Sequence, residues 1–202
     1  MIALNQYYKL ESGETFEEIR KYRVEKSVQI SHATADAKSF QEIFGDLSNC
    51  VFVGSLDLSN LNLNSLEGCP QCVSESLVLD QNPNLTSLKH GPKEIMRSVP
   101  EDQFPLFSAS YTGLENLEYF PEKIPKNLVL KIQDTPISTL SHADPTLLAT
   151  CSEFWFFGSP NLSLEEIFQA THLQRSYTGS FSFVFSQFKR SDLEKLYNSP
   201  KL

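Results

Sequence analysis

Aliphatic residues recur along this chain with a spacing close to 22 positions, and polar residues fill the gaps between them. The clearest repeat joins LDLSNLNLNSLEGCPQCV at 56–73 to LVLDQNPNLTSLKHGPKEI at 77–95. Four positions recur 22 residues later: Leu63, Leu66, Pro70 and Val73 correspond to Leu85, Leu88, Pro92 and Ile95. One unit of about 20 to 29 residues cannot bury its own apolar face, but stacked units share one core. The pattern therefore predicts a solenoid.

The same spacing continues towards the C-terminus with less regular lengths. The next unit has its matching residues 29 positions further on, at Leu114, Leu117, Pro121 and Ile124. The excess falls in MRSVPEDQFP, residues 96–105, whose two prolines and three charges predict a loop inserted between units. A fourth unit is expected at Ile137, Leu140, Pro145 and Leu148, and a fifth in FWFFGSPNL at 154–162.

Each unit holds a pair of positions separated by one residue, apolar in every case but Ser108, which is the alternation of a strand with one buried face. The expected pairs are Leu56/Leu58, Leu77/Leu79, Leu106/Ser108, Leu128/Leu130 and Phe154/Phe156. Stacked units place such strands side by side and parallel. The polar residue expected at the turn after each strand is, in order, Asn60, Asn82, Tyr111, Asp134 and Ser159.

The two ends of the chain do not carry the repeat and are expected to cover the open ends of the solenoid. Residues 1–50 contain a capping box at Thr15 and Glu18, a candidate strand at 22–30 and an amphipathic helix at 35–46. Their expected role is an N-terminal cap; a small independent binding domain is the open alternative. The C-terminal part holds a capping box at Ser163 and Glu166, a last strand at 180–185 and a closing helix from Ser191.

These elements predict an α/β solenoid with three parts. Residues 1–50 form the N-terminal cap, 51–165 the parallel-stranded repeats with the inserted loop at 96–105, and 166–202 the final strand and C-terminal capping helix.

The repeat also resembles a known family. The stretch from Leu63 to Leu88 fits LxSLxxxPxxVxxxLxLxxNPxLTSL, and residues 117–130 read LEYFPEKIPKNLVL. Both resemble the leucine-rich repeats of bacterial secreted effectors and of phage proteins. The resemblance spans roughly 51–165 and implies an irregular leucine-rich-repeat fold with a protein-binding role. Some of these effectors carry a ubiquitin-ligase domain, for which the residues after 165 are too few.

Charge and composition exclude several partners. The net charge is −8 and the pI is near 5.0, so a nucleic-acid ligand is not expected, because such affinity comes largely from Lys and Arg releasing counterions. No segment has the roughly 18 apolar residues of a membrane span, and the N-terminus lacks a signal-peptide pattern. The chain is therefore expected to be cytoplasmic, in the producing cell or in an infected host cell.

The sequence gives little support for chemistry. Cys69 and Cys72 have a spacing that could bind zinc or exchange thiols, but both fall on ordinary repeat positions at a turn. His90 and His142 share a repeat column with Gly68 and Tyr119 and show no metal-ligand spacing. There is no nucleophile motif and no glycine-rich phosphate loop, so neither an enzyme nor a cofactor is expected.

The remaining signal lies in the strand positions that point away from the core. This column turns from polar to aromatic along the stack, and its candidate partner-binding residues are Asp57, Asp80, Phe107, Val129, Trp155 and Phe157. Grouped exposed aromatics are candidate hot spots for a protein partner. The alternative is that the loop at 96–105 or a C-terminal segment covers them.

We therefore expect a non-catalytic module that binds a protein through the concave face of the solenoid, with Asp57 and Asp80 favouring a basic patch. An effector that inhibits a host protein is one form of this expectation, and a small-molecule ligand is not expected. Two alternatives stay open: a thiol-redox or zinc protein built on Cys69 and Cys72, and a structural subunit that assembles through an exposed solenoid edge.

Overall fold

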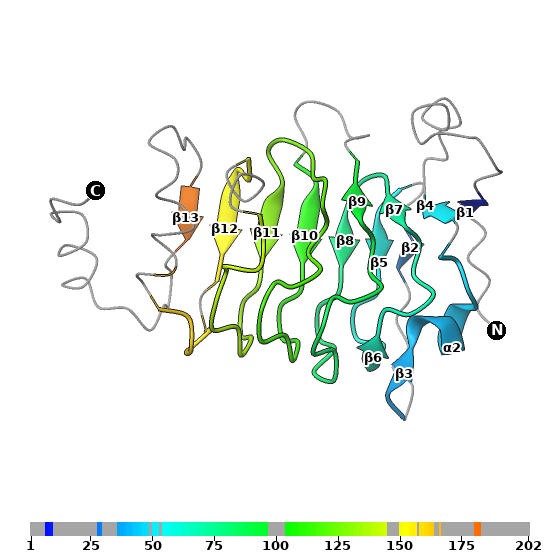
Figure 1. Ribbon diagram of the computed structural model, residues 1–202, viewed down its shortest axis with the longest axis horizontal. Coiled ribbons are helices and arrows are strands. Elements are labelled where there is room, and N and C mark those ends of the chain that lie inside the picture. The colour runs from blue at the N-terminus through cyan, green and yellow to red at the C-terminus, as the bar shows by residue number, and fades with distance from the viewer. Residues whose placement is uncertain are drawn as a thin grey trace, which may run out of the picture.

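The computed structural model describes residues 36–48, 50–52, 54–96, 104–144, 150–156, 158–163 and 166, together with the backbone of three short strands at 7–9, 28–29 and 180–182. It is a parallel β-solenoid of about five turns with very little helix. The turns lie next to one another along the longest axis of the molecule (Figure 1). In the part of the chain that the structure describes, there is no helix long and apolar enough to cross a membrane.

The largest sheet has seven strands in the order β13-β12-β11-β10-β8-β5-β2, and every neighbouring pair is parallel. Consecutive turns therefore place their strands side by side, as the repeat predicted (Figure 1). The strands are β2 (Val28–Gln29), β5 (Leu56–Asp57), β8 (Leu77–Val78), β10 (Leu106–Ser108), β11 (Val129–Lys131), β12 (Glu153–Trp155) and β13 (Ser180–Ser182).

The residues that close each repeat unit form a second sheet. Its strands are β1 (Tyr7–Lys9), β4 (Cys50–Phe52), β7 (Cys72–Val73) and β9 (Glu94–Ile95), in the order β1-β4-β7-β9. Lys123 continues it through an isolated parallel bridge to Glu94. β1 pairs antiparallel with β4 and so occupies the edge of this sheet. A third, two-stranded sheet joins β3 (Lys38–Ser39) to β6 (Leu63–Ser65).

One column of side chains fills the space between the sheets. In the large sheet the paired positions that face this core are Leu56, Leu77, Phe107, Leu130 and Phe154, all at most 2% exposed. The leucines that follow the strands, Leu58 and Leu79, are fully buried beside them. The core is therefore a continuous apolar column, which a single turn could not enclose.

A row of buried polar side chains runs beside this apolar column from the turn of Asn82 onwards. The amide of Asn82, which is fully buried, accepts from the N–H groups of Leu61 and Leu63 and donates to the carbonyls of Leu58, Leu79 and Asp80, over 2.7–3.2 Å. In later turns the same place is taken by Thr112, Thr135 and Ser159. The Thr112 hydroxyl donates to the Ala109 carbonyl, and the hydroxyls of Thr135 and Ser159 both donate to the Ile132 carbonyl. The row satisfies backbone groups at the turn that the solvent cannot reach.

Of the five turn residues predicted from the sequence, only Asn82 and Ser159 belong to this buried row, and the other three belong to a neighbouring row. Asn60, Tyr111 and Asp134 belong to an exposed column with positive φ, together with Gln81 and Gly158. The residue that corresponds to Asn82 in the preceding turn is Leu61. The two rows differ by one position, and only the buried row bonds the turn backbone in the manner expected.

The first described turn starts before residue 51. β2, β3 and β4 pair with β5, β6 and β7 of the following turn, so the solenoid includes part of the segment expected to be a cap. The helix expected at 35–46 is observed as α2, Phe40–Phe44, and it begins at the capping box of Ser39 and Glu42. Its Gln41 N–H donates to the Glu67 carbonyl at 2.8 Å, so α2 lies along the side of the next turn.

The expected helical caps and α/β character are not supported by the described residues. The strand expected at 22–30 appears at Val28–Gln29, and the one expected at 180–185 appears at Ser180–Ser182, parallel to β12. At the C-terminal side the Ser163 hydroxyl accepts from the Glu166 N–H at 3.0 Å, which is one half of the expected capping box, while the Glu166 carboxylate accepts from the Leu140 N–H at 3.0 Å. The helices expected near Thr15 and from Ser191, and the loop between Met96 and Phe104, lie outside the described residues.

Candidate functional site

The outward face of the seven-stranded sheet carries the candidate binding surface. Its middle column, read along the stack, runs through Asp57, Val78, Ser108, Lys131 and Trp155, which are paired in register. A second column joins Leu106, Val129 and Glu153. The N-terminal end of the face carries carboxylates and hydroxyls, and the C-terminal end carries Trp155 beside the charged side chains of Lys131 and Glu153.

Trp155 is held in place by its two neighbours on this face. Its indole Nε1–H donates to Glu153 Oε2 at 2.9 Å, and the Nζ atom of Lys131 lies 4.8 Å from the centre of the indole ring. The side chain is half-buried. A tryptophan fixed in this way loses little rotamer freedom when a partner covers it, and an aromatic of this size is the commonest anchor of a protein interface.

The two aspartates at the polar end are fixed by hydroxyl groups. Asp57 Oδ1 accepts from the N–H and the hydroxyl of Ser59, at 3.0 and 2.6 Å. Asp80 Oδ1 accepts from the Ser108 hydroxyl at 2.6 Å and from the Ser110 N–H at 2.8 Å. Both carboxylates are half-buried, so this end presents negative charge at fixed positions.

An exposed tyrosine stands at the edge of the face. Tyr111 is 52% exposed and follows β10 in the column of positive φ. A hydrogen bond to Asp134 and the charges of Asp134 and Asp80 raise the pKa of its phenol. The hydroxyl of Tyr111 is therefore engaged with Asp134 beside the acidic end of the face.

The sequence-based placement of Phe107 on this face is wrong. Phe107 is 1% exposed and packs edge-on against Phe120, with ring centroids 5.0 Å apart, and Ala109 is fully buried. Phe107 pairs with Leu77, 30 positions earlier, whereas the later leucines of the same unit follow a 29-residue offset. A shift of one residue moves every side chain of a strand to the opposite face. Asp57, Asp80, Val129 and Trp155 do lie on the outward side, and Phe157 lies outside the described residues.

Cys69 and Cys72 lie in the core of the solenoid. Cys69 and Cys72 are 2% and 0% exposed, and burial raises the pKa of the Cys69 thiol far above its usual range. A thiol in such surroundings is inert, because the thiolate is the nucleophile and the metal ligand. Among the described residues, no three His, Cys, Asp or Glu side chains are grouped so that they could hold a metal ion.

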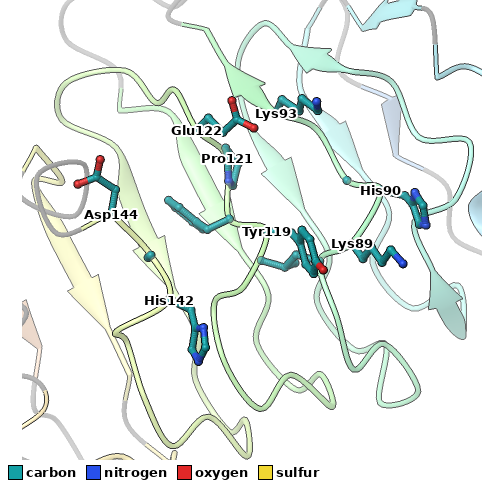
Figure 2. Close-up of a pocket in the computed structure, with 12 residues that line it drawn as sticks. Lys89, His90, Lys93, Tyr119, Pro121, Glu122, His142 and Asp144 are labelled. Atoms are coloured by element: carbon teal, nitrogen blue, oxygen red, sulfur yellow. The ribbon is translucent and has the colours of Figure 1, made fainter.

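A second surface feature was not expected from the sequence. An open groove of about 650 Å³ crosses three successive turns where the chain approaches the second sheet (Figure 2). Its exposed residues include His90, Tyr119 and His142, the repeat column already visible in the sequence. That column was the available signal, but spacing alone does not show that its side chains border a hollow.

Comparisons with protein-family models, with curated proteins and with solved structures find no match, so the repeat class of this chain rests on its own residues and geometry.

Proposed function

We propose that this chain is an irregular leucine-rich-repeat protein that binds another protein through the outward face of the seven-stranded sheet and performs no chemistry of its own. The repeat class is supported by the parallel strands, by the in-register apolar column and by the buried amide of Asn82 at the turn. The single observation that carries the binding role is Trp155, which is half-exposed and fixed between Lys131 and Glu153.

The composition of the face favours a macromolecular partner over a small ligand. Leu106, Val129 and Trp155 are all half-buried and lie on three adjacent strands, so a partner that covers them removes apolar surface from water. Lys131 and Glu153 place charges of both signs beside Trp155. An apolar centre with a polar rim is the usual anatomy of a protein interface.

The distribution of charge indicates how the partner is oriented. Asp57 and Asp80 make the N-terminal end of the face acidic, so a basic patch on the partner fits there and an apolar pocket fits over Trp155. The resemblance to effector and phage repeats favours a host protein as that partner, met inside the cell.

The test is affinity capture followed by measurement with the purified partner. The wild-type chain is used as bait in an extract of its native host, and bound proteins are identified by mass spectrometry. Affinities are then measured for wild type, Trp155→Ala and Tyr119→Ala. Removal of a central aromatic anchor costs about 2 kcal/mol or more, which is roughly a 30-fold loss of affinity.

Tyr119→Ala is the comparison variant, because Tyr119 is an exposed aromatic that lines the groove and not the outward face. The proposal predicts that Trp155→Ala loses about 30-fold in affinity whether or not Tyr119→Ala also weakens binding. A folded Trp155→Ala variant with unchanged affinity would remove the outward face from consideration, and a loss confined to Tyr119→Ala would move the interface to the groove.

A further inference from the structure

The groove in Figure 2 has a floor of buried side chains and a rim of charged ones. The floor is formed by four buried residues, Leu88, Phe120, Pro121 and Ala143. The volume, about 650 Å³, lies in the range of ligand-binding sites. The groove is open to solvent and crosses several turns, so it suits an elongated occupant that lies along the solenoid axis.

The lysines and the carboxylates on the rim come from different turns. Lys89 and Lys93 come from the turn that ends in β9, and an imidazole stands at each end of the groove, His90 on this turn and His142 on the turn of Asp144. The acidic side chains come from the two following turns, Glu122 from the first and Asp144 from the second. Figure 2 shows the lysines at one end of the groove and Asp144 at the other. The groove therefore has a basic end and an acidic end.

The distance between the two ends follows from the stacking of the turns. The Glu122 N–H donates to the Lys93 carbonyl at 2.8 Å, so these two turns are in direct contact. Stacked strands lie about 4.8 Å apart, which places charges two turns apart at about 10 Å. A peptide in the extended polyproline II conformation advances about 3.1 Å per residue and has three residues per turn. Two side chains three positions apart in such a peptide therefore lie on the same side and span about 9 Å, close to the distance between the two ends of the groove.

We propose that this groove binds an extended peptide segment of another protein, in which an acidic and a basic residue stand three positions apart with apolar residues between them. The acidic residue faces Lys89, His90 and Lys93, and the basic residue faces Glu122 and Asp144. The intervening apolar residues cover Pro121 and Phe120. This surface is separate from the face that carries Trp155, so the chain would bind through two surfaces.

The first experiment titrates the full-length chain with short synthetic peptides, followed by NMR. The probe is the acetylated and amidated hexapeptide Gly-Glu-Leu-Pro-Lys-Gly. The comparison peptides replace the charged pair by two glutamines, two glutamates or two lysines. We expect the mixed-charge peptide to bind about fivefold more tightly than the glutamine peptide, the upper range for an exposed ion pair, with shifts in the resonances of His90 and His142.

The second experiment changes the sign of the basic end. In the double variant Lys89→Glu with Lys93→Glu both ends are acidic, so the peptide with two lysines should become the preferred ligand. Lys126→Glu is the matched control, since Lys126 is exposed and is not part of the groove. It should keep the wild-type preference. Circular dichroism of each variant confirms that the fold is retained.

Three results would overturn the proposal: no binding of any peptide, equal affinity for all four, or full competition by free N-acetylglutamate and lysine. The last result would indicate a small-molecule site. None of these outcomes depends on Trp155, and Trp155→Ala should bind the mixed-charge peptide like wild type. Failure of the groove is therefore distinguishable from failure of the partner-binding face.

Discussion

The Nζ atom of Lys131 lies 4.8 Å from the centre of the Trp155 ring, and the two residues are paired across β11 and β12. This contact joins two turns on the outer surface, where the apolar core makes no contribution. It also orients the only tryptophan in the chain, so the fluorescence of one residue reports on the proposed binding face.

Replacing Lys131 by methionine should lower the free energy of unfolding by about 0.5 to 1 kcal/mol, because the cation–π contact is lost while most of the aliphatic stem remains. Urea unfolding followed by Trp155 fluorescence measures the change. Lys126→Met is the control, because Lys126 is exposed at a turn and should change the unfolding free energy far less. Equal effects of the two variants would mean that the contact stabilises nothing.

Phe107→Ala and Val129→Ala should differ strongly, although both positions were expected on the same face. Phe107 is buried against Phe120, so its truncation should cost about 3 to 5 kcal/mol of unfolding free energy. Val129 is half-exposed on the outer face, and its truncation should cost roughly 1 kcal/mol or less. Thermal unfolding of the two variants measures this difference, and similar losses would contradict the register of β10 against β11.

The sequence was sufficient to predict stacked parallel strands, because the apolar residues of each unit must share a core. It was not sufficient to predict, in every unit, which residues of the strand face the core. The turn at 82–85 contains one residue more than the corresponding turn at 112–114. Alignment on the later leucines therefore displaced the strand by one position. Gly113 is found where the turn is shorter, and a Cβ on it would lie 2.6 Å from the Pro83 carbonyl oxygen.

The outer face was only partly predictable for the same reason. In the units of Trp155 and Val129 the inward and outward strand positions were predicted correctly, whereas in the unit of Phe107 they were displaced by one residue. The second sheet was missed because Cys72 and Val73 form a strand of only two residues, too short to show alternation. The groove depends on how far neighbouring turns project from the solenoid, and the spacing of residues in the sequence does not reveal this.

Asn82→Ala should be among the most damaging single substitutions on the polar row. Its amide accepts from the N–H groups of Leu61 and Leu63 at 3.2 and 2.9 Å, and the variant leaves both groups buried without this partner. Each buried group that loses such a partner costs about 1 to 3 kcal/mol, so a loss of roughly 2 to 6 kcal/mol is expected in chemical unfolding.

Asn84→Ala is the matched control, because Asn84 is exposed and donates only to the side chain of Asn62 at 2.7 Å. It should cost less than about 1 kcal/mol. Comparable losses for the two asparagines would show that the buried amide is not what holds the turns together.

The buried thiols should make the protein less stable at alkaline pH. Burial raises the pKa of Cys151 from its ordinary value of 9.0 to about 12. Between these values the unfolded chain loses the thiol proton and the folded chain keeps it. The free energy of unfolding should therefore be unaffected by this group below pH 9.0 and fall as the pH rises towards about 12. Unfolding in urea at a series of pH values measures the slope, which should be shallower in Cys151→Ala than in wild type.

A thiol reagent at pH 8 gives an independent check: the four cysteines should react slowly in the native protein, where all four are buried, and rapidly in urea. Rapid labelling of two thiols in the folded chain would instead revive a redox role for Cys69 and Cys72.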